Sequence, residues 1–290
     1  MNIEQWDEHI AIKNAMDDLI HSLDVSAQMK EMVLHVCASG GKMVRPIILM
    51  LSTQLCGGRF EDSIDASLAI ELIHSASLIQ DDVLDEGILR RGMPSTHRMF
   101  GYSSAILCGD FLISKAIELI SSYDRRSVRD FGRAGMHMSE GEIMDIMSIN
   151  EDFGMDEYME CIRKKTASLF AASASIGAYV GGADEKTAEV CRSFGYNVGT
   201  AYQMVDDILE YVQIIQSKES ENISLSLPSI YQRRMSPERA ISRSVGLVEE
   251  YVSSARSEIA YFKSSQVTDK LLEITDYITL DMLTPDILQK

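Results

Sequence analysis

The sequence is short of several residue types, and each shortage excludes a class of protein. Only five of its 290 residues are proline, and none falls between Pro94 and Pro228, so long helices are not interrupted there. The five cysteines are scattered without a Cys-x-x-Cys pair, which predicts free thiols in a cytoplasmic protein rather than a disulfide framework. No uncharged apolar run reaches the roughly 18 residues of a membrane-spanning helix. The first residues are polar and acidic, unlike a secretory signal.

Basic residues are also in the minority. The chain carries 27 lysines and arginines against 44 aspartates and glutamates, which gives a formal net charge of −17. A nucleic acid needs a basic protein face to neutralise its phosphates, so this balance argues against such a partner. An acidic chain instead suits metal cations, or simply solubility.

Helical periodicity is what the sequence has in abundance. Hydrophobic residues make up 46% of the chain, and they recur at the i, i+3, i+4 spacing of buried helix faces. There is no low-complexity segment, internal repeat or Gly/Ser linker, so we predict one all-α domain, a single large helical bundle, over residues 1–290. The expected helices cover residues 4–23, 27–38, 43–56, 62–85, 103–122, 126–150, 155–180, 185–211, 236–261 and 266–280.

Three clusters share the pattern acid-acid-x-x-acid. Because acidic residues are so common, a single copy is a weak signal, and Glu61–Asp65 fits a helix start where carboxylates cap free N–H groups. The copies at Asp81–Asp85 and Asp206–Glu210 fall at the predicted C-terminal ends of their helices, where each carboxylate costs about 0.3–1 kcal/mol against the helix dipole. Two helices with the same unfavourable placement predict bound cations, and Mg²⁺ accepts carboxylates, waters and phosphate oxygens.

Basic residues occur where a phosphate group could use them. "GGKMVRP" (Gly40–Pro46) places two cations beside glycines at a predicted helix start, whose free amide N–H groups also attract anions. Arg90 and Arg91 follow the first acidic cluster directly, and "RKKTASLF" adds Lys165 and Thr166. Each basic pair alone also fits a solvated surface.

Taken together, these motifs resemble the trans-type, all-α isoprenyl diphosphate synthases. The resemblance spans roughly Gly40 to Pro228 and comprises five blocks in the family's order. They are GGK-x-x-RP, the first aspartate-rich motif with its trailing RRG, "EGEIMDIM" as in octaprenyl-type members, the Lys-Thr pair, and Gln-x-x-Asp-Asp. The resemblance implies a helical bundle around a central deep pocket.

The resemblance also implies a reaction and its residues. Magnesium-assisted loss of diphosphate from an allylic substrate would let isopentenyl diphosphate attack the resulting carbocation, in a homodimer whose product passes to the membrane. Two or three Mg²⁺ would be held by carboxylates, the diphosphates by basic residues, and the carbocation and leaving proton would be flanked by polar groups. The implied metal ligands are Asp81, Asp82, Asp85, Asp206, Asp207 and Glu210; the substrate-binding residues are Lys42, Arg45, His74, Arg90, Arg91 and Lys218; the catalytic residues are Lys165, Thr166 and Gln203.

Several positions depart from the family pattern. Met43 replaces a basic residue, Gln80 replaces a histidine, and Glu210 replaces a third aspartate. The segment that follows lacks the usual glycine-lysine lid pattern, and Lys218 is the only candidate for the lid lysine. These departures affect the expected lid closure more than the reaction type.

Product length in this family depends on residues one to two turns before the first aspartate motif, where bulky aromatics form the floor of the pocket. Here Ala76 and Ser77 are small, so Ile73 and Ile70 further along the helix become the expected floor. We therefore expect a product longer than C20, of C25 to C40. A short-chain farnesyl or geranylgeranyl diphosphate synthase, with its floor supplied by another helix or by a partner subunit, is the alternative.

Other functions share some of these features. Glu71-x-x-His74 has the spacing of a di-iron carboxylate bundle, although no second copy accompanies it. A terpene cyclase on the same scaffold would not need the second diphosphate site implied by Lys42, Arg45 and Arg91. A non-catalytic regulatory subunit would be expected to lose an aspartate motif, and both are retained.

Overall fold

The computed structural model describes residues 2–38, 41–148, 153–217 and 226–284, and confirms the predicted all-α fold. Its strands are a hairpin of two residues each, β1 and β2. The elements are η1 (Ile3–Gln5), α1 (Asp7–Ser22), α2 (Ala27–Ala38), α3 (Val44–Leu55), η2 (Phe60–Ser63), α4 (Ile64–Leu84), β1 (Leu89–Arg90), β2 (Met93–Pro94), α5 (Thr96–Phe100), α6 (Tyr102–Ile120), α7 (Arg125–Ser148), α8 (Met155–Ile162), η3 (Arg163–Ala167), α9 (Ser168–Val180), α10 (Glu185–Ser217), α11 (Leu227–Gln232), α12 (Pro237–Ile259), α13 (Gln266–Ile278) and η4 (Leu280–Met282).

Helix α9 is the centre of the bundle. Every residue from Ser168 to Tyr179 is buried, which fits its sequence of small and apolar side chains. Helices α3, α7 and α10 all pack against it. The contact with α3 is close because Gly177 has no side chain: a Cβ there would lie 2.1 Å from the carbonyl oxygen of Leu49.

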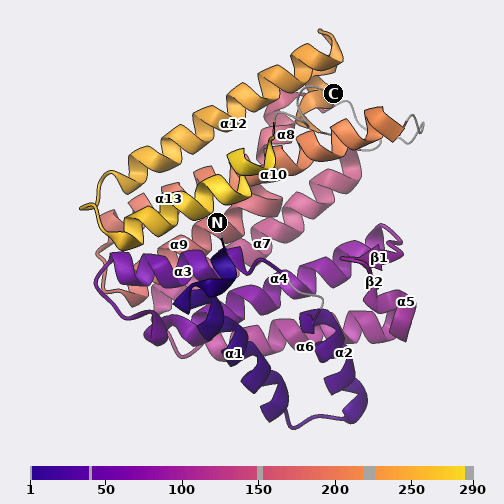
Figure 1. Cartoon of the computed structure of the whole chain (residues 1–290). Helices are drawn as coiled ribbons and strands as arrows, with labels where there is room; N and C mark the ends of the chain where they lie inside the picture. The colour runs from indigo at the N-terminus through magenta and orange to yellow at the C-terminus, as the bar shows by residue number, and fades with distance from the viewer. Residues whose placement is uncertain (1, 39–40, 149–152, 218–225, 285–290) are drawn as a thin grey trace.

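The remaining helices flank this centre on two sides (Figure 1). Helices α1, α2 and α6 gather around α4, α12 packs against α10, and α13 packs against α12 and α3. Both α4 and α10 run toward the same end of the molecule, on the right in Figure 1, so their C-terminal halves lie at one end of the bundle. This arrangement puts the two acidic motifs at the same end.

The turn after α4 is tight and strained. Helix α4 stops at Leu84, and the hairpin β1–β2 pairs Leu89 with Pro94. Arg91 adopts a left-handed backbone with φ of 51° next to Gly92 with φ of 80°, a conformation that non-glycine residues seldom adopt. The backbone at Arg91 is therefore strained, and this conformation sets the direction of the Arg91 side chain. Such strain is typical of functional sites.

The structure differs from the predicted helices in three respects: a break within one helix, a later end of another, and two short helices that were not predicted. The helix expected over 155–180 is two α-helices joined by the single π-helical turn η3. The helix expected over 185–211 continues to Ser217, so the second acidic cluster lies inside α10 rather than at its end. The short helices α5 and α11 were not predicted, because a helix of five or six residues leaves little periodicity to read.

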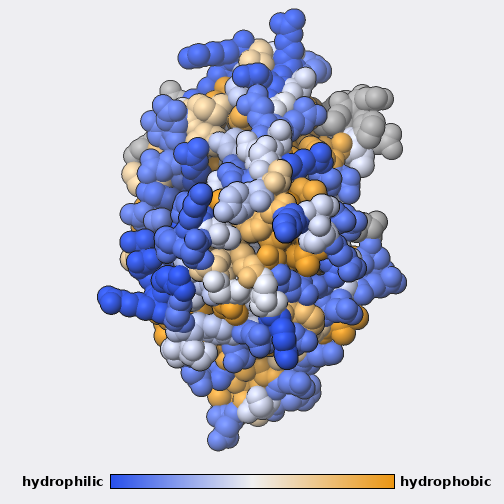
Figure 2. Space-filling model, turned by 90° about the vertical axis from the view of Figure 1, so that its left-hand side faces the viewer, coloured by the Kyte–Doolittle hydropathy of each residue, from blue (hydrophilic) through white to orange (hydrophobic). Residues whose placement is uncertain are grey.

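The surface is largely polar. Figure 2 shows one face on which hydrophilic residues predominate and hydrophobic residues form smaller patches near the middle. Across the described residues, no helix combines the length and the apolar character needed to cross a bilayer.

Candidate active site

The first acidic motif ends α4 with three carboxylates in different environments. Asp82 is buried and accepts hydrogen bonds from Nε and Nη2 of Arg90 at 3.0 and 2.6 Å. Asp81 is half-buried, and burial together with the nearby Glu142 raises its pKa to about 7, although Lys165 opposes the shift. Asp85 is exposed. A carboxylate that is hard to ionise without a cation nearby is a suitable ligand for one.

Lys165 faces Asp81 from the π-helical turn η3. Its ammonium lies 2.5 Å from Oδ2 of Asp145 and 2.8 Å from Oε2 of Glu142, both on α7. Burial lowers the pKa of Lys165, but Asp145 and Glu142 outweigh burial and raise it, so the side chain stays charged. The two carboxylates thus hold a cation beside the first acidic motif.

The π turn depends on the close approach of α7. A Cβ on Gly141 would lie 2.2 Å from the backbone nitrogen of Lys165. Only glycine therefore lets α7 pack directly against η3, where the widened turn aims consecutive residues, Lys165 and Thr166, at the site.

Thr166 connects the π turn to the second acidic motif. Its hydroxyl donates to Oε1 of Gln203 at 2.6 Å, and the Gln203 amide donates to Oδ1 of Asp207 at 3.0 Å. Oδ2 of Asp207 accepts further hydrogen bonds from the hydroxyl of Tyr158 at 2.6 Å and from the backbone N–H of Leu227 at 3.2 Å. Burial raises the pKa of Asp207 to about 6, and these donors limit the shift. The carboxylate that was expected to bind metal is thus engaged by three protein donors.

The other acids of the second motif face a different set of neighbours. Burial raises the pKa of Asp206 to about 6, while a hydrogen bond from Tyr202 and the charges of Arg45 and Lys42 oppose the shift. Glu210, one turn further along α10, is exposed. Because α10 continues for more than a turn beyond Glu210, the dipole penalty expected of this cluster does not apply to it.

Four residues predicted to bind a diphosphate line one cavity of about 620 Å³, which we call the cationic cavity. Lys42 and Arg45 reach it from the start of α3, and Arg91 reaches it from the hairpin. His74 joins them from α4 and has a pKa well below its usual value, because burial and the charge of Arg45 disfavour the imidazolium.

Arg45 is held in place but keeps a donor free of protein partners. Its Nη1 lies 3.1 Å from Nε2 of His74, and its guanidinium lies 4.4 Å from the ring centre of Phe170. Its Nε is buried and has no hydrogen-bond partner among the described residues. A buried donor without an acceptor is costly, and an anion in the cavity would provide one.

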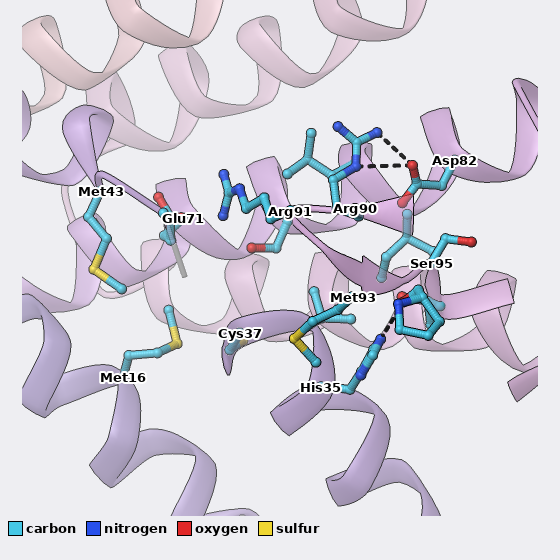
Figure 3. A pocket seen from close by; sticks show the side chains of 17 residues that line it. Met16, His35, Cys37, Met43, Glu71, Asp82, Arg90, Arg91, Met93 and Ser95 are labelled. Carbon is cyan, nitrogen blue, oxygen red and sulfur yellow. Dashed lines mark hydrogen bonds and ion pairs between the residues drawn. The ribbon is translucent and has the colours of Figure 1, made fainter. Parts of the chain in front are cut away.

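The two arginines of the hairpin point in opposite directions (Figure 3). Arg90 turns back to Asp82, whereas Arg91 extends toward Glu71 and the start of α3. The Arg91 guanidinium comes so near Gly41 that a Cβ there would lie 2.8 Å from Nη1. Two consecutive residues of the hairpin therefore serve different neighbours, Arg90 the carboxylate of Asp82 and Arg91 the chain at Gly41.

An apolar cleft of about 600 Å³ begins at Asp81 and Lys165 and extends between α4, α6 and α7. Ser77 and Ile73 line it, two of the four residues that were expected at a product pocket, Ile73 as part of its floor. Ile70 and Ala76 do not line it: both side chains are fully buried in the core cluster that α4 forms with its neighbouring helices. The other apolar lining residues are Ile79, Val83, Leu84, Ile106, Ile113, Met138, Ile143 and Ile146.

Two further site predictions concern a metal centre and a lid lysine. No three His, Cys, Asp or Glu side chains converge into a ready-made metal cage within the ranges that the structure covers. Lys218, the predicted lid lysine, lies outside the described residues.

Comparisons with known proteins agree with this geometry. The polyprenyl synthetase family profile matches residues 26–229. The chain belongs to the polyprenyl synthetase family. Over 283 residues it is 49% identical to geranylfarnesyl diphosphate synthase of Methanosarcina mazei, covering 98% of this chain and 96% of that protein. Over 210 residues it is 39% identical to geranylgeranyl diphosphate synthase of Sulfolobus acidocaldarius, covering 68% and 63%. The crystal structure of a geranyltranstransferase from Methanosarcina mazei superposes with a TM-score of 0.87, at 46% identity, covering 98% and 100%.

Membership of the polyprenyl synthetases confirms the predicted reaction class. The chain is a prenyl diphosphate synthase, a transferase of alkyl groups. This result replaces the di-iron alternative, and in the structure His74 is paired with the guanidinium of Arg45.

The structure adds polar groups to this polyprenyl synthetase site that the motif analysis did not assign. Glu142 and Asp145 lie within the quoted block "EGEIMDIM", so a signal for them was present, but only the fold shows that they meet Lys165. Tyr158 carried no motif signal in the sequence, and Glu71 was noted only for its Glu-x-x-His spacing with His74, not for a place at this site. They become visible only when separate helices pack together.

Proposed function

We propose that the protein condenses isopentenyl diphosphate with an allylic diphosphate to give a trans-polyprenyl diphosphate. The supporting observation is the pairing of two spaces with different chemistry across α4. The cationic cavity offers Lys42, Arg45 and Arg91 to the diphosphate of isopentenyl diphosphate. The apolar cleft offers a charged mouth at Asp81 and Lys165 followed by aliphatic walls, which suits an allylic diphosphate with a growing hydrocarbon tail.

In this proposal Mg²⁺ is held by carboxylates of the two acidic motifs. The oxygen donors and the raised pKa values of Asp81 and Asp206 fit a hard cation, which would favour their ionised forms. Mg²⁺ usually takes one or two protein carboxylates and completes its shell with waters and substrate phosphates, so a closed protein cage is not required. The metal would neutralise the negative charge that develops on the diphosphate as it leaves.

The protein side chains would act around that leaving group. Arg90 and Lys165 lie beside the first acidic motif, where they would bind the allylic diphosphate and stabilise it as it leaves. The Thr166 hydroxyl and the Gln203 amide oxygen would face the carbocation with their dipoles. Asp207 and Tyr158 fix the position of that amide through hydrogen bonds.

We further propose a product longer than C20. In the described residues the lining of the apolar cleft contains no aromatic side chain, and Ser77 leaves the space beyond Asp81 open. The relative that is 49% identical over almost the whole chain is named geranylfarnesyl diphosphate synthase. A C20 product is the second candidate, because other relatives are named geranylgeranyl diphosphate synthases.

The test is a product assay with purified protein, Mg²⁺, isopentenyl diphosphate and each allylic primer in turn. Chromatographic sizing of the dephosphorylated products should show chains longer than C20. Accumulation of the C20 chain with every primer would favour the second candidate. Absence of any elongated product from folded protein would reject the proposed reaction.

We also propose that residues 1–290 act as one domain within a homodimer. Helix α6 exposes Ile106, Leu107 and Ile117, and the neighbouring α7 exposes Met136 and Ile143. Apolar side chains gathered on adjacent helices are typical of a protein–protein interface.

A further inference from the structure

The N-terminal segment forms one wall of the cationic cavity. Asn2, Ile3, Glu4 and His9 line it together with the basic residues that the motifs identified. Resting on the proposed function, we infer that His9 is a further ligand of the diphosphate group of isopentenyl diphosphate. None of the sequence motifs includes this residue.

The imidazole of His9 can donate a hydrogen bond, and the described part of the protein provides no acceptor for it. Its side chain is only 9% exposed, and its ring has no hydrogen bond to any residue within the described ranges. It nevertheless borders open space in the cavity rather than packing wholly into the core. Its ring nitrogens are not sealed in the core like Nε of Arg45, so a phosphate oxygen that enters the cavity can take the place of water as their hydrogen-bond partner.

The wall that carries His9 is fixed to the rest of the protein. The adjacent Glu8 is 2% exposed and accepts two hydrogen bonds from the Lys270 ammonium on α13, at 3.0 and 2.7 Å. The same ammonium lies 5.2 Å from the centre of the Trp6 ring, and Ile3 is buried in the core. Contacts of the residues just before His9 therefore fix the start of α1, from which His9 lines the cavity.

The charge of the cavity favours one more donor. Its lining contains three cationic side chains, Lys42, Arg45 and Arg91, and two acidic ones, Glu4 and Glu71. A diphosphate monoester carries several negative charges, so hydrogen bonds from uncharged groups add needed stabilisation. An imidazole ring donates at least one hydrogen bond whether it is neutral or charged, so His9 can donate to a phosphate oxygen in either protonation state.

The kinetic test compares His9→Phe and His9→Gln with the wild type. Phenylalanine keeps the bulk and removes the donor, so KM for isopentenyl diphosphate should rise about tenfold while KM for the allylic substrate stays nearly constant. Glutamine restores a donor and should recover part of the affinity. His21→Phe is the matched control, because His21 is exposed at the other end of α1 and should leave both constants unchanged. An unchanged KM for isopentenyl diphosphate in folded His9→Phe would overturn the inference.

A binding test avoids dependence on turnover. Trp6 is the only tryptophan in the chain and lies three residues from His9, so its fluorescence reports on this wall. Titration with isopentenyl diphosphate, and separately with inorganic diphosphate, should give about tenfold weaker binding of both probes to His9→Phe. Equal binding to both proteins would reject the role of His9 even if the enzyme elongates prenyl chains. Wild-type binding without any elongation would instead reject the proposed function and leave the His9 contact standing.

Discussion

Ala76 and Ser77 are neighbours in the sequence but face different surroundings in α4. Ser77 borders the apolar cleft, and its hydroxyl donates to the carbonyl of His74 at 2.8 Å. Ala76 is fully buried in the core and does not reach the cleft. One residue of register, about 100° around a helix, thus separates a position that can control product length from one that supports the fold.

We expect Ser77→Phe and Ala76→Phe to have different effects. The ring at position 77 would block the cleft one turn below Asp81, so the main product should become shorter with little loss of stability. The ring at position 76 would overpack the core and destabilise the protein by about 1–3 kcal/mol. Product chromatography and thermal unfolding would measure both effects. If Ser77→Phe leaves product length unchanged, the floor of the pocket lies elsewhere.

Glu71 gives the protein a pH-dependent stability. Burial raises the pKa of this carboxyl above the usual 4.5, although Arg45 and Arg91 oppose the shift. The folded state therefore retains a proton that the unfolded state has lost, and the free energy of unfolding falls as pH rises from about 4.5 through the raised pKa. Glu71→Gln should lack this decrease. Urea denaturation of both proteins between about pH 5 and 8 would reveal it, and parallel curves would contradict the prediction.

At the scale of elements, the site is assembled where helices approach closely. The π turn η3 interrupts what would otherwise be one helix from Met155 to Val180, and α7 lies directly against it. Lys165 and Thr166 then point at different helices: the first meets α7, and the second meets α10. The glycine at position 141 is what permits this contact.

Gly141→Ala and Gly132→Ala form a matched pair on α7. Alanine at position 141 would clash with the backbone of Lys165, so stability and activity should both fall, the former by at least about 1 kcal/mol. A Cβ at position 132 meets no atom within 4 Å, and alanine there should stabilise the helix by about 0.5–1 kcal/mol. Chemical denaturation and turnover rates would compare the two. Equal stability of both variants would show that η3 can move away from α7.

For the whole molecule, the exposed apolar side chains of α6 and α7 are the feature that most needs an explanation. Leu107 and Ile117 are 59% and 54% exposed on one helix. Leucine and isoleucine exposed together on neighbouring helices suit burial against a second copy of the chain. The same helices form two walls of the apolar cleft, so assembly and product pocket share structural elements.

We expect the double variant Leu107→Glu and Ile117→Glu to be monomeric. Charges at the centre of an apolar interface are costly to bury without partners, whereas a single chain would leave them in water. Light scattering after gel filtration would give the mass of the wild type and the variant. Leu34→Glu, which changes a similarly exposed leucine on α2, is the control and should keep the wild-type mass. An unchanged mass in the double variant would place the interface elsewhere.

The sequence by itself determined the fold class and the reaction class. Helical periodicity is a local property, and each motif is a short run of residues, so both can be read without knowing what packs where. The boundaries of α10 and the break at η3 were not predictable in this way, because packing against α7, α9 and α12 decides them.

Only the tertiary structure decided which side chains meet. Asp207 and Tyr158 are 49 positions apart in the chain, and Lys270 and Glu8 are 262 apart. It also separated Ile70 and Ala76 from the cleft and brought His9 to the cationic cavity. The physical reason is that burial and hydrogen bonding depend on neighbours from distant segments, whose positions follow from the packing of the whole bundle.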